Sequence, residues 1–113
     1  MSSSPRLLLV AAVKGHRRVE LVMEGFLELG LPGATVLDAK GMGQIVSTEL
    51  PIFSGFRSMF PGSGEASYLI LSVLTEEEVG EAIAMVREVC GDFAEKGTGI
   101  VFTVPVTGFF GPG

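Results

Sequence analysis

The sequence has few of the side chains that build disulfides, metal sites and nucleic-acid interfaces. Its 113 residues include one cysteine, one histidine and no tryptophan. The single cysteine, Cys90, excludes a disulfide within the chain and fits a reducing compartment. Eight Lys and Arg residues stand against 13 Asp and Glu, and no basic run is longer than Arg17-Arg18. Because binding to nucleic acid needs clustered phosphate contacts, we expect no nucleic-acid partner. With one cysteine and one histidine, we also expect no metal site.

The sequence also has no long hydrophobic run. The longest, residues 7–13, is about a third of a membrane span. Lys14 ends this run, and no cleavage site for a signal peptidase follows it. We therefore expect a cytoplasmic protein that is not membrane-embedded.

Hydrophobic residues nevertheless make up 47% of the chain, and the mean hydropathy is +0.50. Because single cores typically occupy roughly 100–150 residues, the length predicts one domain over residues 1–113. Residues 1–5, M-S-S-S-P, are expected to form a flexible tail. A mean hydropathy this high predicts that apolar surface is buried in an oligomer.

Hydrophobic periodicity predicts four strands and two helices. The strands are expected at residues 7–13, 34–40, 66–74 and 100–106, and the helices at 17–29 and 76–93. Thr75 and Glu78 have the spacing of a capping box at the start of the second helix. Residues 41–65 lack a period and are expected to form a long loop.

The order β-α-β, loop, β-α-β predicts an α+β, ferredoxin-like fold. In this fold a four-stranded antiparallel sheet carries both helices on one face. The opposite face has no helix of its own, and its strands are apolar. We therefore expect that face to pack against other subunits.

Three motifs lie in order along the chain. They are V-K at residues 13–14, T-V-x-x-x-K-G-x-G at 35–43 and G-x-G-I-V-F-T-V-P-V at 97–106. With these motifs the chain, from residue 6 to 106, resembles the PII nitrogen-regulatory signal-transduction proteins. The resemblance implies a homotrimer, and residues 44–65 match the long T-loop of that family.

The resemblance also implies a nucleotide site at the cleft between neighbouring subunits. Glycines suit such a site because they let backbone N–H groups approach an anion. The alternative is that both Gly-x-Gly pairs are merely turns. The residues implied for the site come from the two glycine-rich segments: Thr35, Gly41, Met42, Gly43, Gln44, Gly97, Thr98 and Gly99.

Two positions depart from the family pattern. Ile100 stands where family members have a lysine that grips phosphate, and Gln44 stands where they usually have an arginine. The remaining candidate cations are Lys14, Lys40 and Lys96. This lower charge favours ADP, AMP or another small anion over tightly bound ATP.

The T-loop-like segment is rich in apolar residues, which predicts docking to a partner protein. The resemblance implies that this partner is a regulated enzyme or a membrane transporter. The alternative is that these side chains pack back against the trimer. Arg57 lies where the family has its modified tyrosine, so uridylylation is not expected. The partner-binding residues are expected to be Ile52, Phe53, Phe56, Arg57, Met59 and Phe60.

No catalytic constellation is visible in the sequence. His16 has no Cys or His at ligand spacing and is expected to be solvated just before the first helix. Nothing places Asp38 and Glu49 as a hydrolytic pair, and Ser47-Thr48 has no base nearby. Cys90 lies on the apolar stripe of the second helix and is expected in the core. We therefore expect a regulator that is not an enzyme.

The alternative function is a structural or ion-tolerance trimer similar to the CutA family, without nucleotide binding. That alternative calls for a Cys or His cluster, which this sequence does not have.

ATP is expected to bind this chain far more weakly than an ordinary family member. Two lost charge-assisted contacts cost together about 3–6 kcal/mol, which is at least about a hundredfold in affinity. The double substitution Ile100→Lys with Gln44→Arg should partly restore ATP binding, and AMP should be affected less. Calorimetry measures this directly, and micromolar binding of ATP by the unmodified protein would contradict the prediction.

Overall fold

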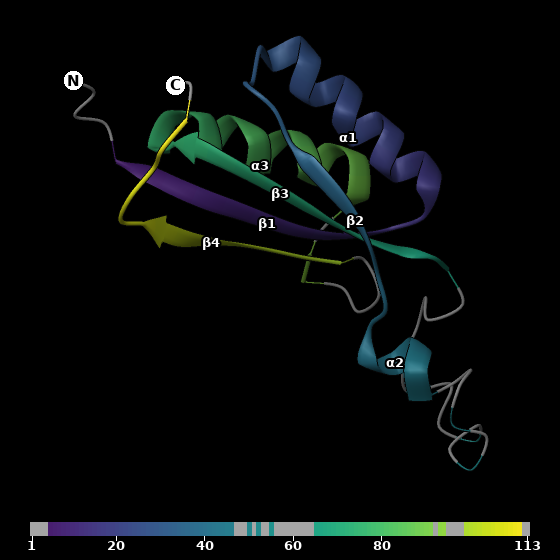
Figure 1. Ribbon diagram of the computed structural model, residues 1–113. Helices are drawn as coiled ribbons and strands as arrows, with labels where there is room; N and C mark the ends of the chain where they lie inside the picture. The colour runs from purple at the N-terminus through teal and green to yellow at the C-terminus, as the bar shows by residue number, and fades with distance from the viewer. Residues whose placement is uncertain are drawn as a thin grey trace.

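Four strands and three helices make up the described part of the chain (Figure 1). The computed structural model describes residues 5–46, 50, 52, 55, 65–91, 93–94 and 99–111. The elements, in chain order, are β1 Arg6–Lys14, α1 His16–Leu29, β2 Thr35–Ala39, α2 Met42–Gln44, β3 Ser67–Thr75, α3 Glu76–Cys90 and β4 Ile100–Val106.

The strands form one sheet in the order β2-β3-β1-β4, with every neighbouring pair antiparallel. Both long helices, α1 and α3, lie on the same side of this sheet (Figure 1). Strands β1 and β3 are central, so they carry the longest runs of buried residues. The structure therefore confirms the α+β, ferredoxin-like fold and its antiparallel sheet.

The helix ends differ slightly from those that periodicity predicts. Helix α1 begins at His16, because Gly15 adopts φ 90° and donates its backbone N–H to the Ala66 carbonyl, 2.8 Å away. Helix α3 ends at Cys90, three residues before Phe93, and Gly91 follows it with φ 89°. The segment expected to be a loop from residue 41 begins with the single turn α2.

The core lies between the sheet and the two long helices. Strand residues Leu9, Val13 and Ile70 are fully buried there. Helix α1 contributes Val22 and Phe26, and α3 contributes Val79, Ala82 and Val86. The two helices approach closely at Gly25, where an added Cβ would overlap the side chain of Met85.

The opposite side of the sheet is apolar across all four strands. Because side chains alternate along a strand, the residues between those of the core point away from the helices. The register aligns Phe102, Val10 and Leu71 in one row and Ile100, Ala12, Leu69 and Leu37 in the next. We call this surface the bare face: Leu8, Val10, Ala12, Leu37, Leu69, Leu71, Val73, Ile100, Phe102 and Val104.

Four side chains of the bare face are strongly exposed in the single chain. Their exposed fractions are 56% for Ile100, 46% for Phe102, 44% for Leu37 and 41% for Val104. Contiguous apolar surface of this kind marks sites of association. Among the described residues, no helix is both long and apolar enough to cross a membrane.

The start of α3 is stabilised by the capping box that the sequence predicts. Thr75 Oγ1 accepts from the Glu78 backbone N–H at 3.3 Å, and Glu78 Oε1 accepts from the Thr75 backbone N–H at 2.9 Å. Each bond satisfies a donor that would otherwise lack a partner at the helix terminus.

Replacement of this cap should destabilise the protein measurably. We expect Thr75→Ala to lower the free energy of unfolding by about 1 kcal/mol. Thr107→Ala is the matched control, since Thr107 is exposed and follows β4. Denaturant titration compares the two, and equal losses in both variants would show that the capping box contributes nothing.

Candidate functional site

The structure divides the predicted site residues between the two ends of β2. Thr35 is the first residue of this strand, whereas Gly41, Met42, Gly43 and Gln44 follow its last residue, Ala39. Five strand residues span roughly 15 Å. Within one chain, therefore, Thr35 is not brought together with the residues of the first Gly-x-Gly.

A cavity of about 620 Å³ lies at the Thr35 end of the sheet. Its apolar wall includes Leu8, Leu71 and Val73 of the bare face, and its edge is formed by the turn before β2. The polar and charged residues that line it are Arg6, Thr35, Ser72, Thr75 and Glu78. Its volume is typical of pockets that hold a small organic ligand.

The C-terminal segment supplies one wall of this cavity. Phe109 lines it, and the guanidinium carbon of Arg6 lies 4.4 Å from the centre of the Phe109 ring. This cation–π contact holds the segment after β4 beside the start of β1. Sequence reasoning missed Arg6, Glu78 and Phe109; the signal for Phe109 was the apolar pair in T-G-F-F after the last strand.

Chemically, this cavity combines an apolar wall with one cation, Arg6, one carboxylate, Glu78, and the hydroxyl groups of Thr35 and Thr75. The Ser72 hydroxyl donates to the Gly33 carbonyl, so it holds the turn before β2 in place. An aromatic ring can pack on the apolar wall, and Arg6 can pair with an anionic group. The arrangement suits a planar molecule whose anionic group lies beside Arg6 and away from Glu78.

A second, smaller cavity of about 260 Å³ lies at the other end of β2. Asp38, Lys40 and Gln44 line one side, and Ser67 and Tyr68 line the other. Gln44 is the first residue of the T-loop-like segment and Ser67 lies just beyond its end, so the cavity sits where the segment leaves and rejoins the sheet. In α2, which lies beyond the end of β2 (Figure 1), the side-chain oxygen of Gln44 is buried.

The two Gly-x-Gly motifs differ in what they require of the backbone. Gly99 has φ 124°, and an added Cβ would overlap the carbonyl oxygen of Ala12 in β1. Gly41 has an ordinary extended backbone, with φ −78°, and an added Cβ would meet nothing within 4 Å. Gly99 therefore has a structural reason to be glycine, whereas the described residues give no such reason for Gly41. Gly97 and Thr98 lie outside the described residues.

The end of the T-loop-like segment is attached to the first turn of α1. Arg18 Nη1 lies 3.4 Å from Glu65 Oε2, and the same group donates to the Lys14 carbonyl at 3.1 Å. The Gly15–Ala66 backbone bond is adjacent to this pair. Both side chains of the ion pair are partly exposed, so its net contribution to stability is small.

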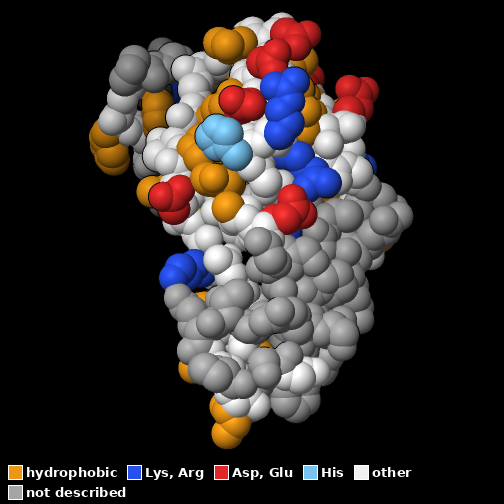
Figure 2. Space-filling view, turned by 90° about the vertical axis from the view of Figure 1, so that its right-hand side faces the viewer, with side chains coloured by type: hydrophobic (Ala, Val, Ile, Leu, Met, Phe, Trp, Pro, Cys, Tyr) orange, Lys and Arg blue, Asp and Glu red, His pale blue; other side chains and the backbone are white. Residues whose placement is uncertain are grey.

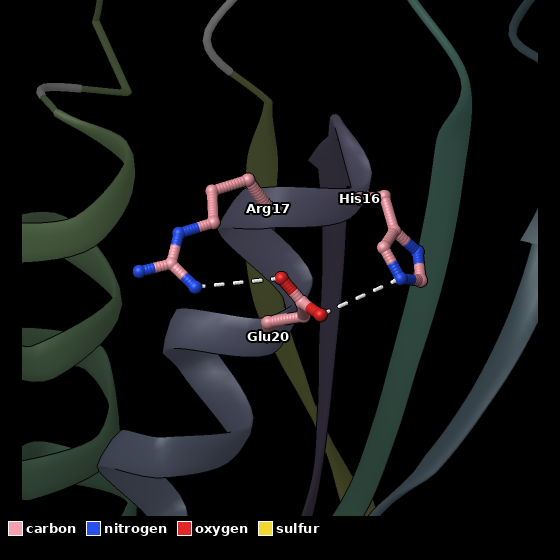
Figure 3. Close-up of polar contacts among 3 residues, drawn as sticks. All are labelled: His16, Arg17 and Glu20. Atoms are coloured by element: carbon pink, nitrogen blue, oxygen red, sulfur yellow. Dashed lines mark hydrogen bonds and ion pairs between the residues drawn. The ribbon is translucent and has the colours of Figure 1, made fainter.

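His16, expected just before the helix, is the first residue of α1. Its Nε2 lies 3.7 Å from Glu20 Oε2, and Glu20 also accepts from Arg17 at 3.4 Å (Figure 3). The imidazole meets the ring of Tyr68 edge-on, with centroids 5.9 Å apart. Figure 2 shows the histidine, in pale blue, at the surface beside hydrophobic side chains. Within the described residues, no group of three His, Cys, Asp or Glu could hold a metal ion.

Cys90 is buried in the core, as its place on the helical stripe predicts. Burial raises the pKa of the thiol, and the nearby Arg18 only partly opposes this shift. The thiol therefore stays protonated at neutral pH and is a poor nucleophile.

Several predicted residues lie in parts of the chain that the structure does not describe. Ile52 is described and is 84% exposed, which leaves its side chain accessible to a partner. Lys96 and Glu49 are outside the described residues, as are Ser47 and Thr48. The same holds for the other predicted partner-binding residues, Phe53, Phe56, Arg57, Met59 and Phe60.

Comparison with known proteins identifies the fold. No protein-family model matches the sequence, and no curated protein is significantly similar to it. Among solved structures, the crystal structure of Arabidopsis thaliana PII bound to citrate matches with a TM-score of 0.62 and 23% sequence identity. The match covers 91% of this chain and 78% of that chain. The chain therefore has a PII-like fold.

The contrast between the two glycines gives a direct test of their roles. We expect Gly99→Ala to lower the free energy of unfolding by more than about 1 kcal/mol, because of its positive φ and the overlap with Ala12. Gly41→Ala should be neutral or slightly stabilising. Thermal unfolding measures both, and a stable Gly99→Ala variant would remove the structural explanation for this glycine.

Proposed function

We propose that this protein is a PII-like regulator: a homotrimer that senses a small molecule at the clefts between subunits and signals to a partner through residues 44–65. The observation that carries the proposal is the apolar bare face with a ligand-sized cavity at its edge. The PII-like fold supports it, since the same arrangement of strands is found in a PII protein.

The bare face supports association into a closed oligomer. It extends over both central strands and both edge strands, and its edge-strand residues are the most exposed. Burial of such a surface is stabilised by the hydrophobic effect, at about 25 cal/mol for each Å² removed from water. Closed symmetric packing covers the same patch on every subunit and leaves none exposed.

Association would also assemble the ligand site. Thr35 and the cavity beside it lie at one end of β2, and Gly41–Gln44 lie at the other. Two copies can bring these ends together, with Thr35 from one subunit and Gly41, Gly43 and Gly99 from its neighbour. The backbone conformation at position 41 does not require glycine. Close approach of a ligand or of a neighbouring subunit would explain why a glycine stands there.

The charges favour a ligand with few phosphates. Arg6 supplies a cation in the larger cavity and Glu78 a carboxylate, whereas Ile100 at the start of β4 offers no charge. The net charge of −5 opposes the binding of a polyanion. ADP or AMP is therefore the proposed ligand class, with the nucleobase on the apolar wall.

Signalling would use the attachments of the T-loop-like segment to the sheet. Gln44 starts the segment within α2, and Glu65 ends it in contact with Arg18. A ligand that contacts Gly41 or Gln44 therefore acts on the segment at its root. The partner would be a regulated enzyme or a membrane transporter, recognised through Ile52 and the apolar residues that follow it.

Charge on the bare face should prevent assembly. We expect the unmodified protein to sediment as a trimer of its 11.9 kDa chain, and Phe102→Asp to sediment as a smaller species. The physical reason is that a carboxylate cannot be buried between apolar strands without a partner. Sedimentation equilibrium measures both species. A stable monomer of the unmodified chain at micromolar concentration would contradict the proposal.

The control lies on the same strand. Thr103→Asp adds the same charge to β4, but Thr103 is exposed and lies on the other face, so this variant should remain assembled. The ligand arm uses the unmodified protein: ADP and AMP should raise the melting temperature, because a ligand of the folded state stabilises it. If the protein assembles but neither nucleotide shifts its melting temperature, the trimer is supported and nucleotide sensing is excluded.

A further inference from the structure

The smaller cavity, at the root of the T-loop-like segment, carries two opposite charges on one strand end. Asp38 lies in β2 and Lys40 directly follows the end of the strand, and both residues line the cavity. Residues two apart on an extended chain project to the same side, roughly 6–7 Å apart. A carboxylate and an ammonium group at this spacing complement a ligand that carries one charge of each sign.

The other walls offer polar atoms and an aromatic ring. Tyr68 is the cross-strand partner of Asp38 in the β2–β3 register, and its ring is held edge-on by His16. Ser67 and Gln44 also line the cavity, and the polar groups there include the hydroxyl groups of Ser67 and Tyr68. These groups can bond to a short polar side chain on the ligand.

The volume limits what can enter. At about 260 Å³ the cavity is less than half the size of the one beside Thr35, and it is below the usual range for drug-sized ligands. A nucleotide does not fit there, but a molecule of the size of a free amino acid does.

We infer that this cavity binds a small zwitterion, of the class of the free α-amino acids. The Asp38 carboxylate accepts from the ligand ammonium group, and the Lys40 ammonium group donates to the ligand carboxylate. Asp38 and Lys40 are both exposed, so water competes for them and the affinity is in the millimolar range.

A ligand in this position would join the two ends of residues 44–65. Gln44 is the first residue of the segment and Ser67 lies just beyond its end, and both line the cavity. The regulatory consequence, an effect on the segment, rests on the proposed function, whereas binding of the zwitterion does not.

The test compares L-serine with its two one-charge analogues on the unmodified protein. Calorimetry should show binding of L-serine, and at least about tenfold weaker binding of 3-hydroxypropionate, which lacks the ammonium group, and of ethanolamine, which lacks the carboxylate. Equal affinity for all three, or no binding of L-serine at millimolar concentration, overturns the inference.

Variants assign each charge to its residue. Asp38→Asn should lower the affinity for L-serine at least about tenfold and leave the affinity for 3-hydroxypropionate unchanged. Lys40→Gln should lower the affinity for L-serine and leave the affinity for ethanolamine unchanged. Glu28→Gln is the control, since Glu28 is exposed near the end of α1 and does not line the cavity. If Glu28→Gln lowered the affinity for L-serine equally, the effect would come from the net charge of the protein and not from the cavity, and the assignment would be overturned.

Titration with ADP in the same preparations separates the two proposals. If L-serine binds and ADP does not, the zwitterion site is supported and nucleotide sensing is excluded. If ADP binds and L-serine does not, nucleotide sensing is supported and the zwitterion site is excluded.

Discussion

Both long helices must cover the same face of a four-stranded sheet, and this constraint determines the rest of the molecule. The two crossover connections leave α1 and α3 packed side by side, with Gly25 allowing their close approach at Met85. The apolar side chains of both helices pack against one face of β1 and β3. The other face keeps its apolar side chains and has no covering element among the described residues. The proposed association with further copies would cover this face.

Both cavities lie at the ends of the edge strand β2. The first turn of α3 reaches the larger one, which Glu78 lines. The larger one is closed by the chain after β4, held through Arg6 and Phe109. The smaller one lies where residues 44–65 leave and rejoin the sheet. Because their volumes differ, the ligands proposed for them differ as well: a nucleotide for the larger cavity and a small zwitterion for the smaller one.

Periodicity and capping signals predicted the fold well, because the core depends on regular spacing of apolar residues. The order of elements and the Thr75–Glu78 cap could be read from the sequence. The first residue of α1 was harder to predict, because it depends on a backbone hydrogen bond between Gly15 and Ala66, which is remote in sequence. The cavity walls could not be predicted either: Arg6 and Phe109 meet only because β1 and β4 pair antiparallel. The two Gly-x-Gly motifs look alike in sequence, yet Gly99 lies against a carbonyl oxygen and Gly41 does not.

The shortness of β2 has a consequence for communication between sites. In the proposed trimer each β2 would end in two different clefts, with Thr35 in one and Gly41 in the next. All five residues of β2 pair with β3, so the strand would connect the two clefts directly. A ligand that displaced one end of β2 would then act on the other end, and the three clefts of the proposed trimer would be coupled in a closed ring. Successive ligands would then bind with unequal affinities, although the three sites are identical in sequence.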